Sequence, residues 1–478
     1  MKFNKKIAVA VSGAVLLLAG QIALADSTTD IVDALVSKGV LTEEEGKLIT
    51  KGHDSQKKAQ GNVGFKDGFK FNSGDGQSNM SIHGRVQLDS RSYSGNSGGT
   101  ANSKFADTFD VRRAYLGAKG TFKKYYEWEV TADFASLTGD GGEAPVSGSA
   151  TKGSTSLDVA YLNVNYWDKK AMFQFGQYKQ PYSLEERTSS RFLDFQERSF
   201  VNNTSLTPGK ERGVMIHGTP IAGVNYALAF STGQGKNTND VNNLEDGKDT
   251  ILHLDANFAE IMGNKEAIFH VGGSYGFGDL PQAAFGSQRT EGRGNEFFKS
   301  TTPNGTSMER TRYNLEGVAA YGPVKLQGEY GNANFEGKYS NGTSFDKEID
   351  AYYVSALWLI TGEKYADAFK GGKFDRIVPK NEFNPDFSSL GAWEVSARYS
   401  NFDASDIGLN VANTLSLNSN TANTLKADAY TVGLKWIPQA NARFLMNYVH
   451  TDFDTPITVS GKTLNKEKAL MFRAQYDF

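Results

Sequence analysis

The chain has 478 residues and a nearly balanced charge, with 51 Lys and Arg against 54 Asp and Glu. It contains no cysteine, which excludes disulfide bonds and cysteine-based zinc sites. Because no global basic field is available to attract a polyanion, and no nucleic-acid-binding module is recognisable, we expect no nucleic-acid partner.

The N-terminal residues predict an export signal. A basic start with three lysines precedes an apolar run from Ile7 to Leu18 and a small-residue cleavage site ending at Ala25. This order is typical of a secretory signal peptide, which we assign to residues 1–25. A membrane anchor is the alternative, but the apolar run is shorter than the ~20 residues that a spanning helix needs. Removing the signal leaves 48 Lys and Arg against 54 Asp and Glu, a formal charge of about −6.

Residues 26–60 are the region with helical periodicity. Apolar residues recur at helical spacing in its first half, and Gly39 is a suitable C-terminal stop. The run from Thr42 to Glu45 has the sequence of a capping box, which predicts a second short helix through Leu48. We expect a helical hairpin outside the main domain, either as an extension without further role or as a device for trimer or cell-wall contact.

Period-two alternation replaces the helical pattern from Ser81 to the C-terminal residue. A stretch rich in Gly, Lys and Asp, residues 61–80, separates the two regions and is expected to be a linker with one short strand. We identify sixteen segments with alternation or β-rich composition. They span residues 82–93, 109–121, 125–135, 157–166, 171–178, 211–218, 223–232, 250–259, 266–276, 311–321, 323–332, 348–359, 391–402, 426–436, 440–451 and 468–478.

The last segment shows what this alternation means. Between Leu470 and Phe478 the even positions are apolar or aromatic, whereas the odd positions include Arg473, Gln475 and Asp477. One face therefore suits lipid and the other suits water. Such a strand would invite aggregation at the edge of a soluble sheet, but it fits a transmembrane barrel, which has no edges. The mean hydropathy of −0.46 agrees with a barrel, because only alternate residues face lipid.

The sequence thus predicts an all-β fold, a sixteen-stranded antiparallel transmembrane β-barrel over residues 81–478, with a short N-terminal periplasmic helical segment. The connections between the predicted strands support this topology. Short links, such as Lys123–Lys124 and Gly322–Pro323, lie between longer ones, such as residues 136–156 and 401–425. Short periplasmic turns and long external loops are typical of an outer-membrane barrel, and an even strand number leaves both ends on the periplasmic side.

The connection over residues 179–210 differs from the others. It carries Arg187, Arg191 and Arg198 together with four acidic residues and aromatic residues that include Phe192 and Phe195. In sixteen-stranded barrels the third external loop commonly folds inward and narrows the pore. An ordinary surface loop is the alternative, and composition leaves both open, because long loops are often functional.

Four short sequences within the predicted barrel are distinctive. They read IHGRVQLD from Ile82, VRRAYL from Val111, LE from Leu184 followed by TSSR from Thr188, and GAWEV from Gly391. The paired arginines before Ala and an aromatic residue, combined with the Thr-Ser-Ser-basic run, resemble the phosphate-selective porin family, porins O and P. The resemblance extends from about residue 80 to the C-terminus.

The resemblance implies a trimer of sixteen-stranded barrels in the bacterial outer membrane. Pore arginines and third-loop residues would replace the hydration shell of a passing anion by charge-assisted hydrogen bonds. The implied partners are small anions such as phosphate, outer-membrane lipid, further copies of the chain, and the outer-membrane assembly machinery, which would recognise Phe478. By motif matching, the implied pore and anion-binding residues are Arg85, Arg112, Arg113, Asp158, Ser189, Ser190 and Arg191.

Strand periodicity raises a question about three of these residues. Arg112 and Arg113 are adjacent, so in a regular strand one of them would face lipid at a cost of ~2–4 kcal/mol near the midplane. Either a bulge turns both inward, or Arg112 sits at an interface or under the folded loop. Asp158 has the parity of Ala160 and Leu162, the expected outward face. For each arginine, the alternative role is a solvated lumen residue paired with a wall acid.

Two departures from the family pattern oppose anion attraction. Glu186 stands where the family has a lysine in the third loop, and Asp255 stands where phosphate-specific members carry an arginine of their conducting ladder. Arg187, beside Glu186, is a candidate compensating cation and completes the set of pore residues. Fold and transport class therefore follow from the resemblance more directly than phosphate selectivity does.

The leading functional interpretation is a passive channel for small hydrophilic solutes, biased towards anions such as phosphate or other oxyanions. One alternative is a non-selective or weakly cation-selective general porin, and another is a surface adhesin acting through external loops such as residues 277–310. We expect no enzyme, because the six histidines are scattered and none lies near a nucleophile-like motif. We expect neither a cofactor nor a metal site.

Overall fold

The structure, a computed structural model, describes residues 27–60, 62–64, 68–94, 107–135, 155–202, 206–233, 235–237, 248–281, 285–300, 307–338, 342–407, 424–459 and 462–478. The predicted signal peptide lies outside the described residues. The chain divides into two compact units at the boundary between Met80 and Ser81.

The first unit contains a helical hairpin, α2 (Ser27–Ser37) and α3 (Glu43–Gln60). The predicted capping box forms, because the Glu45 backbone N–H donates to the Thr42 hydroxyl at 3.2 Å and the Thr42 N–H donates to the Glu45 carboxylate at 2.9 Å. Helix α3 continues well beyond Leu48, where we predicted its end. The later residues lack apolar periodicity but include Lys, Gln and Ala, which have high helix propensity.

Two short strands follow the hairpin, where the sequence predicted one. Strand β1 (Asn62–Gly64) pairs antiparallel with β2 (Phe69–Asn72). Among the residues that the structure describes, no helix is both long and apolar enough to cross a membrane.

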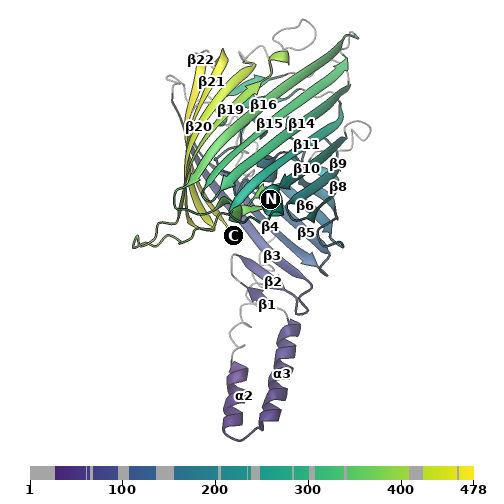
Figure 1. Cartoon of the computed structure of the whole chain (residues 1–478), viewed down its shortest axis with the longest axis vertical. Coiled ribbons are helices and arrows are strands. Elements are labelled where there is room, and N and C mark those ends of the chain that lie inside the picture. Colours follow the sequence, from purple (N-terminus) through teal and green to yellow (C-terminus); the bar gives the residue numbers. More distant parts are fainter. Residues whose placement is uncertain are drawn as a thin grey trace, which may run out of the picture. The chain divides into compact units, whose positions relative to one another are not determined.

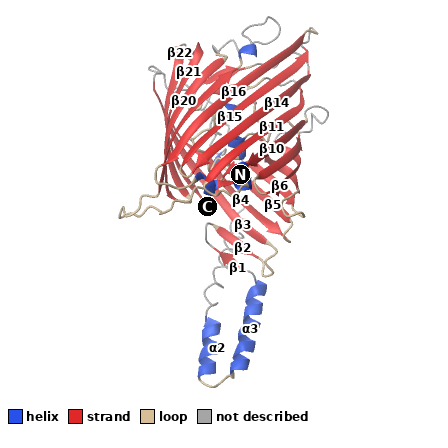
Figure 2. Cartoon of the chain, in the orientation of Figure 1, coloured by secondary structure: helices blue, strands red, loops and turns tan. Residues whose placement is uncertain are grey.

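The second unit is a closed antiparallel barrel (Figures 1 and 2). All sixteen predicted segments are strands, and β22 pairs with β3, from Lys468 opposite Ser94 to Asp477 opposite Arg85, which closes the sheet. The wall strands in chain order are β3 (Asn79–Ser94), β4 (Thr108–Phe122), β5 (Tyr126–Asp133), β6 (Ser156–Val164), β7 (Met172–Lys179), β8 (Lys210–Ile221), β9 (Val224–Ser231), β10 (Asp249–Asn257), β11 (Ala267–Pro281), β14 (Ser307–Tyr321), β15 (Val324–Lys338), β16 (Ser344–Leu359), β19 (Ala392–Asp403), β20 (Lys426–Gln439), β21 (Ala442–Val459) and β22 (Lys462–Asp477).

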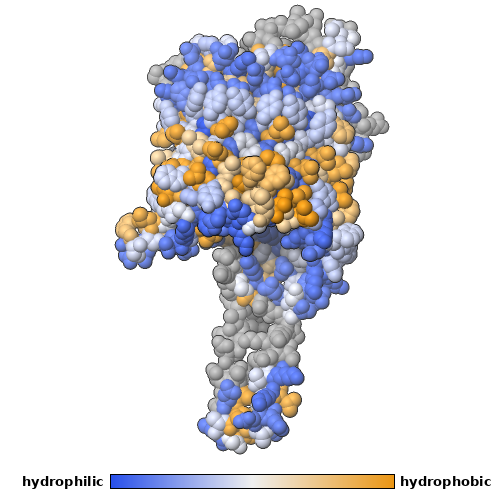
Figure 3. Space-filling view, in the orientation of Figure 1, coloured by the Kyte–Doolittle hydropathy of each residue, from blue (hydrophilic) through white to orange (hydrophobic). Residues whose placement is uncertain are grey.

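The alternation along the strands separates two faces of the wall, as predicted. On β22, Leu470 and Tyr476 are 51% and 55% exposed, whereas Arg473 and Asp477 are buried inside. Figure 3 shows the outward result, a band of apolar side chains across the strands between two hydrophilic zones. Aromatic pairs such as Trp393 stacked on Trp436 lie on the outer face, as in the aromatic girdles of membrane barrels.

Three connections fold inside the barrel instead of covering its ends. The first, residues 180–209, contains α4 (Leu184–Arg187) and the 3-10 helix η3 (Phe200–Asn202). The second, residues 285–300, contains the hairpin of β12 (Ser287–Arg289) and β13 (Glu296–Lys299). Its buried Phe297 packs edge-to-face on Phe200 of the first connection and on Phe402 of the wall. Aromatic contacts thus fix both connections to the wall.

The third connection, residues 360–391, comes from the turn side of the barrel, where short links were expected. Its first part, as far as Ile377, folds inside, whereas Phe383 packs on Trp436 of the outer face. It contains η5 (Tyr365–Ala368) and the two-residue strands β17 (Phe369–Lys370) and β18 (Lys373–Phe374). Its residues Tyr365, Phe369 and Phe374 are buried against apolar residues of the inner wall, including Ile268 and Leu357. Conversely, the loop-side links over residues 339–343 and 460–461 are short, so the alternation of lengths does not hold throughout. The remaining short helices are α5 (Phe258–Ile261) and η6 (Ser405–Ile407).

Candidate functional site

The connection over residues 180–209, here called the constriction loop, crosses the barrel lumen with its described residues, 180–202 and 206–209. Near its start, Leu184 and Glu185 donate their backbone N–H groups to Glu329 of β15 at 3.0 and 2.8 Å. Farther along, the Gln196 N–H donates to Asn447 of β21 at 2.7 Å. The loop therefore touches wall strands far apart in the barrel, and of the two alternatives for this loop the structure has the inward one.

Two arginines of the wall face this loop without a carboxylate partner. Arg85 donates from a terminal guanidinium nitrogen to the Ser190 hydroxyl at 2.9 Å, and its guanidinium lies 4.3 Å from the ring centre of Tyr115. Arg113 donates to the side-chain oxygen of Gln87 at 2.9 Å. Both arginines are buried, and every partner named in these contacts is a neutral side chain. Their positive charge is thus left to act on the lumen.

A third arginine joins them from the loop. Arg191 lies 3.0 Å from the Nδ1 atom of His83, and its backbone N–H donates to the Ser189 hydroxyl at 3.3 Å. Burial lowers the pKa of Arg191. Among the described residues, no ion pair joins a carboxylate to Arg85, Arg113 or Arg191. These three arginines with Ser190, here called the arginine cage, combine charged and neutral hydrogen-bond donors.

A shift in alternation explains how both arginines of the pair reach inward. Arg112 donates to Glu197 of the constriction loop at 3.1 Å, and Asp110, two residues earlier, contacts Arg91 inside the barrel. Arg113 is also inside, through Gln87. Adjacent residues on one face mark a break in alternation between Arg112 and Arg113, as a β-bulge produces. Both Arg112 and Arg113 thus face the barrel interior, and Arg112 lies under the constriction loop, where it contacts Glu197.

A second irregularity corrects the expected orientation of Asp158. The pairing of β5 with β6 shifts register there, because Thr131 faces Val159 whereas Ala132 faces Leu157. The skipped residue, Asp158, is buried inside, so parity with Ala160 was the wrong guide. Its carboxylate accepts a bond from Lys210, accepts another from Tyr115 at 3.2 Å, and lies 3.8 Å from Lys236.

Arg112 differs from the cage arginines because it is neutralised. The Glu197 carboxylate contacts Arg112 at 3.1 Å, Arg473 at 3.0 Å, Arg91 at 3.4 Å and Arg293 at 3.8 Å. Burial alone would raise the pKa of Glu197, but these arginines, Arg112 foremost, hold it well below its usual range. Glu197 therefore carries a negative charge that offsets part of the positive charge of these arginines.

The two acids that depart from the family pattern are also neutralised. Glu186 lies 3.1 Å from Arg198 and 3.8 Å from Lys179. Asp255 lies 3.2 Å from Arg187, which also contacts Glu316. Neither acid is thus a free negative charge in the lumen, and Arg187 offsets Asp255 and not its neighbour Glu186. Arg112 and Arg187 thus have the alternative role that we considered, that of a lumen arginine paired with an acidic residue.

Several residues of this site escaped the sequence interpretation. Gln87, Tyr115 and Lys210 contact predicted site residues directly, and Glu197 and Arg293 come from two different connections. Gln87 and Tyr115 lie within the motifs that carried the resemblance and share the inward parity of Arg85 and Arg113, which is a usable signal. Nothing in the sequence pairs Glu197 with its arginines, because that contact depends on the path of the loop.

Comparisons with known proteins agree with this architecture. The sequence profile of the family "Phosphate-selective porin O and P" matches residues 80–478. The chain belongs to this family. Porin O of Pseudomonas aeruginosa is 26% identical over 432 residues, which cover 86% of this chain and 90% of that relative. The protein is thus a porin of the bacterial outer membrane, and its family and fold are those of a channel and not of an enzyme.

Solved porins share the fold at low identity. An anion-selective porin from Comamonas acidovorans superposes with a TM-score of 0.50 at 12% identity, covering 84% of this chain and 100% of that one. The channel DcaP of Acinetobacter baumannii gives a TM-score of 0.49 at 13% identity, covering 85% and 99%. At this identity the likeness concerns the barrel alone.

Proposed function

We propose that this porin conducts small oxyanions such as phosphate through the arginine cage, with a moderate preference for anions over cations. The observation that carries the proposal is the absence, among the described residues, of any carboxylate paired with Arg85, Arg113 or Arg191 at the constriction loop. A passing oxyanion meets three guanidinium groups whose hydrogen bonds to side chains are with neutral groups, those of Ser190, Gln87 and His83. The Nε atom of Arg85 has no hydrogen-bond partner among the described residues. The name of the relative Porin O and the family description agree with this class of solute.

The residue types suit an oxyanion that has to lose part of its water. A guanidinium offers a planar fork of donors to two oxygens at once, and the Ser190 hydroxyl, which accepts from Arg85, has its own proton to donate. Charge-assisted hydrogen bonds of this kind are about twice as strong as neutral ones. Asp158 assists indirectly, because it holds Lys210 and Tyr115 beside the cage.

The preference is moderate because most other lumen arginines are paired with acids. Arg310 and Arg312 share Asp249, Arg398 contacts Glu291 at 2.6 Å, and Arg473 contacts Asp89 at 2.6 Å. These pairs present little net charge to a distant ion. A weakly cation-selective or non-selective general porin is therefore the second candidate, favoured by the net negative charge of the chain.

Reversal potentials across a KCl gradient in planar bilayers, with and without phosphate, test the proposal. We expect anion preference and block of the chloride current by phosphate. Arg113→Ala should lower the anion-to-cation permeability ratio by roughly 2-fold to 10-fold, as expected for loss of one charge at a water-lined constriction. Arg310→Ala is the matched control, because Asp249 retains Arg312 there and the ratio should change less.

Cation preference without phosphate block would refute the oxyanion proposal, and an unchanged ratio in Arg113→Ala would place this arginine outside the conduction path. A protein that inserts but does not conduct would instead favour the surface adhesin. That alternative lost part of its basis, because residues 285–300, within the loop considered for it, are folded inside the barrel.

We also propose that the porin is a homotrimer, as the family resemblance implies. Strands β5, β7 and β9 have 8 residues each, fewer than the ~9–11 that a tilted spanning strand needs, whereas β21 has 18. A neighbouring copy would cover this low wall. Semi-native gel electrophoresis with cross-linking tests the stoichiometry, and a monomer under both conditions would contradict the trimer.

Recognition of Phe478 by the assembly machinery stays a prediction. Deleting Phe478 and measuring insertion of the porin into the outer membrane tests it.

A further inference from the structure

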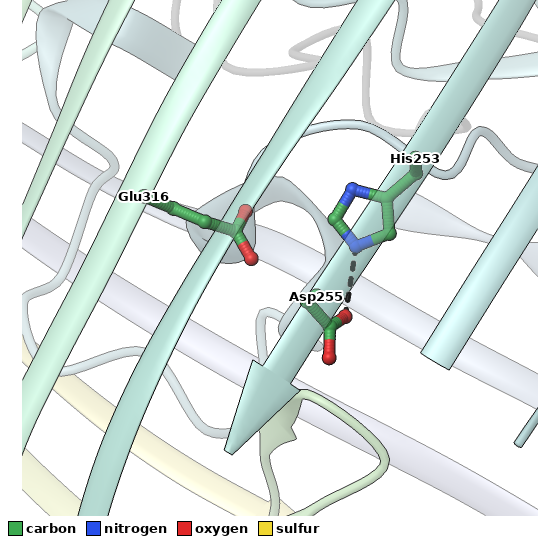
Figure 4. A group of neighbouring side chains, drawn as sticks. All are labelled: His253, Asp255 and Glu316. Atoms are coloured by element: carbon green, nitrogen blue, oxygen red, sulfur yellow. Dashed lines mark hydrogen bonds and ion pairs between the residues drawn. The ribbon is translucent and has the colours of Figure 1, made fainter. Parts of the chain in front are cut away.

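Four inward-facing side chains that can ligate a metal meet on the inner wall of β10, β11 and β14. His253 and Asp255 follow one another on the inner face of β10, with the His253 Nε2 atom 2.8 Å from the Asp255 carboxylate (Figure 4). Glu316 of β14 faces them, and one ligand atom from each of these three residues lies within 4.8 Å of the others. His270 of β11 lies between, 2.9 Å from Glu316 and 4.0 Å from Asp255.

Two glycines keep the space between these side chains open. Gly272 pairs with Asp255 on one side and with Glu316 on the other. A Cβ atom at Gly272 would come within 2.7 Å of a Glu316 oxygen, and one at Gly372 would come within 2.3 Å of an Asp255 oxygen. The space in front of the two carboxylates, into which the Arg187 guanidinium reaches, thus depends on the lack of a side chain at both positions.

The cluster also has unused donor atoms. The Nδ1 atom of His270 and one carboxylate oxygen of Glu316 are buried without a hydrogen-bond partner. Buried polar atoms are rarely left unsatisfied, because each costs about 1–3 kcal/mol. Both atoms belong to residues whose other polar atoms already point into the cluster. The cluster can therefore accept further ligand bonds, at the His270 Nδ1 atom and at this carboxylate oxygen of Glu316.

We propose that this cluster binds a divalent transition-metal ion of the Zn²⁺ class through His253, Asp255 and Glu316, with His270 as a fourth ligand. Two imidazoles and two carboxylates are a donor set that Zn²⁺ accepts in a four-coordinate site. Zn–N and Zn–O bonds of about 2.0–2.1 Å place tetrahedral ligand atoms about 3.3 Å apart, so ligand atoms now within 4.8 Å of one another have to approach by at most about 1.5 Å.

Arg187 competes with the metal for the same carboxylates. Its guanidinium bridges Asp255 and Glu316 and also donates to the Gly372 carbonyl at 2.8 Å. It therefore joins the constriction loop to the wall and to the connection over residues 360–391. A divalent ion neutralises both carboxylates, whereas the guanidinium neutralises one. Metal binding displaces Arg187 from the cluster and leaves its charge in the lumen.

Equilibrium dialysis of the detergent-purified full-length porin against Zn²⁺ in a phosphate-free medium tests the binding. We expect one Zn²⁺ per chain in the wild-type protein and loss of that ion in His253→Ala. Arg187→Ala should raise the affinity about tenfold or more, because the competing occupant of the site is removed. His217→Ala is the matched control, since His217 is also a lumen histidine but bonds to Asn163, away from the cluster; it should retain the ion.

A second readout is electrical. Zn²⁺ should shift the reversal potential of the wild-type channel towards greater anion preference, because the lumen gains the charge of the ion, and should leave His253→Ala unshifted. No binding to the wild-type protein overturns the proposal, as does binding that survives His253→Ala. Binding that is not strengthened by Arg187→Ala overturns the competition. The shift is read relative to the metal-free channel, so it is independent of whether that channel prefers anions.

Discussion

Glu197 gives the sharpest test of how the lumen is charged. Its carboxylate is held by Arg112, Arg473 and Arg91 at 3.1, 3.0 and 3.4 Å, so it occupies the position that a bound oxyanion would take among them. Glu197→Gln keeps the shape of the side chain and removes one negative charge. We expect the variant to prefer anions more strongly than the wild type, because these arginines then lack part of their counter-charge.

The size of the effect follows from Coulomb's law. An ion passing at about 8 Å gains about 0.5 kcal/mol in a water-like dielectric and about 2 kcal/mol at an effective dielectric constant of 20. These energies correspond to a rise in anion permeability of roughly 2-fold to 30-fold, and the opposite change for the cation raises the anion-to-cation ratio further. Loss of a buried charge also weakens the anchoring of the loop, which we expect as lower thermal stability, at a cost of up to ~3–5 kcal/mol.

The assay is the reversal potential in a KCl gradient, with Glu197→Asp as the matched control, because this variant shortens the side chain but keeps the charge. A raised ratio in Glu197→Gln alone supports the competition between Glu197 and passing anions. An equal rise in both variants would attribute the effect to a loosened loop. An unchanged ratio in Glu197→Gln would refute the reasoning.

Three further predictions concern pH, packing and the inserted connection. The arginines hold the pKa of Glu197 well below its usual range, so its negative charge, and with it the anchoring of the constriction loop, persists from about pH 8 to 5 and is lost only at lower pH. Below that range the anion preference of the wild-type channel should rise, and that of Glu197→Gln should rise less. Gly272→Ala should lower thermal stability by about 1–3 kcal/mol, measured by heat-dependent gel mobility, because its Cβ meets Glu316 and Asp255. Phe374→Ala should raise single-channel conductance, because Phe374 lies 3.8 Å from the Lys325 ammonium and packs on Phe369, whereas exposed Phe387 in the same connection serves as the control. Unchanged conductance in Phe374→Ala would show that residues 360–391 do not narrow the pathway.

The sequence predicted the barrel wall well, because a strand that faces lipid on one side and water on the other has to alternate. All sixteen segments are strands, and Arg473 lies on the inner face, as the pattern indicates. Parity failed between Arg112 and Arg113, which both lie inside, and at Asp158, where one extra residue in the strand reverses the faces. A bulge changes the count by one residue without changing composition, so only the pairing of neighbouring strands reveals it.

The candidate site was less predictable, because its contacts join residues distant in the chain. Glu197 and Arg473 are separated by 276 positions, and His253 and Glu316 lie on different strands. The inward fold of residues 360–377 was also missed, since their aromatic residues are compatible with either an exposed link or an inserted one. Which of these applies depends on the apolar inner wall that receives them.

The sequence by itself determined the compartment, the strand number and the residue types offered to the lumen, because these follow from local periodicity that the bilayer imposes on every strand. Only the tertiary structure decided which arginines remain without an acid. That outcome depends on where the constriction loop places Glu197, Glu186 and Arg187, and a loop fixed by scattered hydrogen bonds to several strands leaves no periodic trace in the chain.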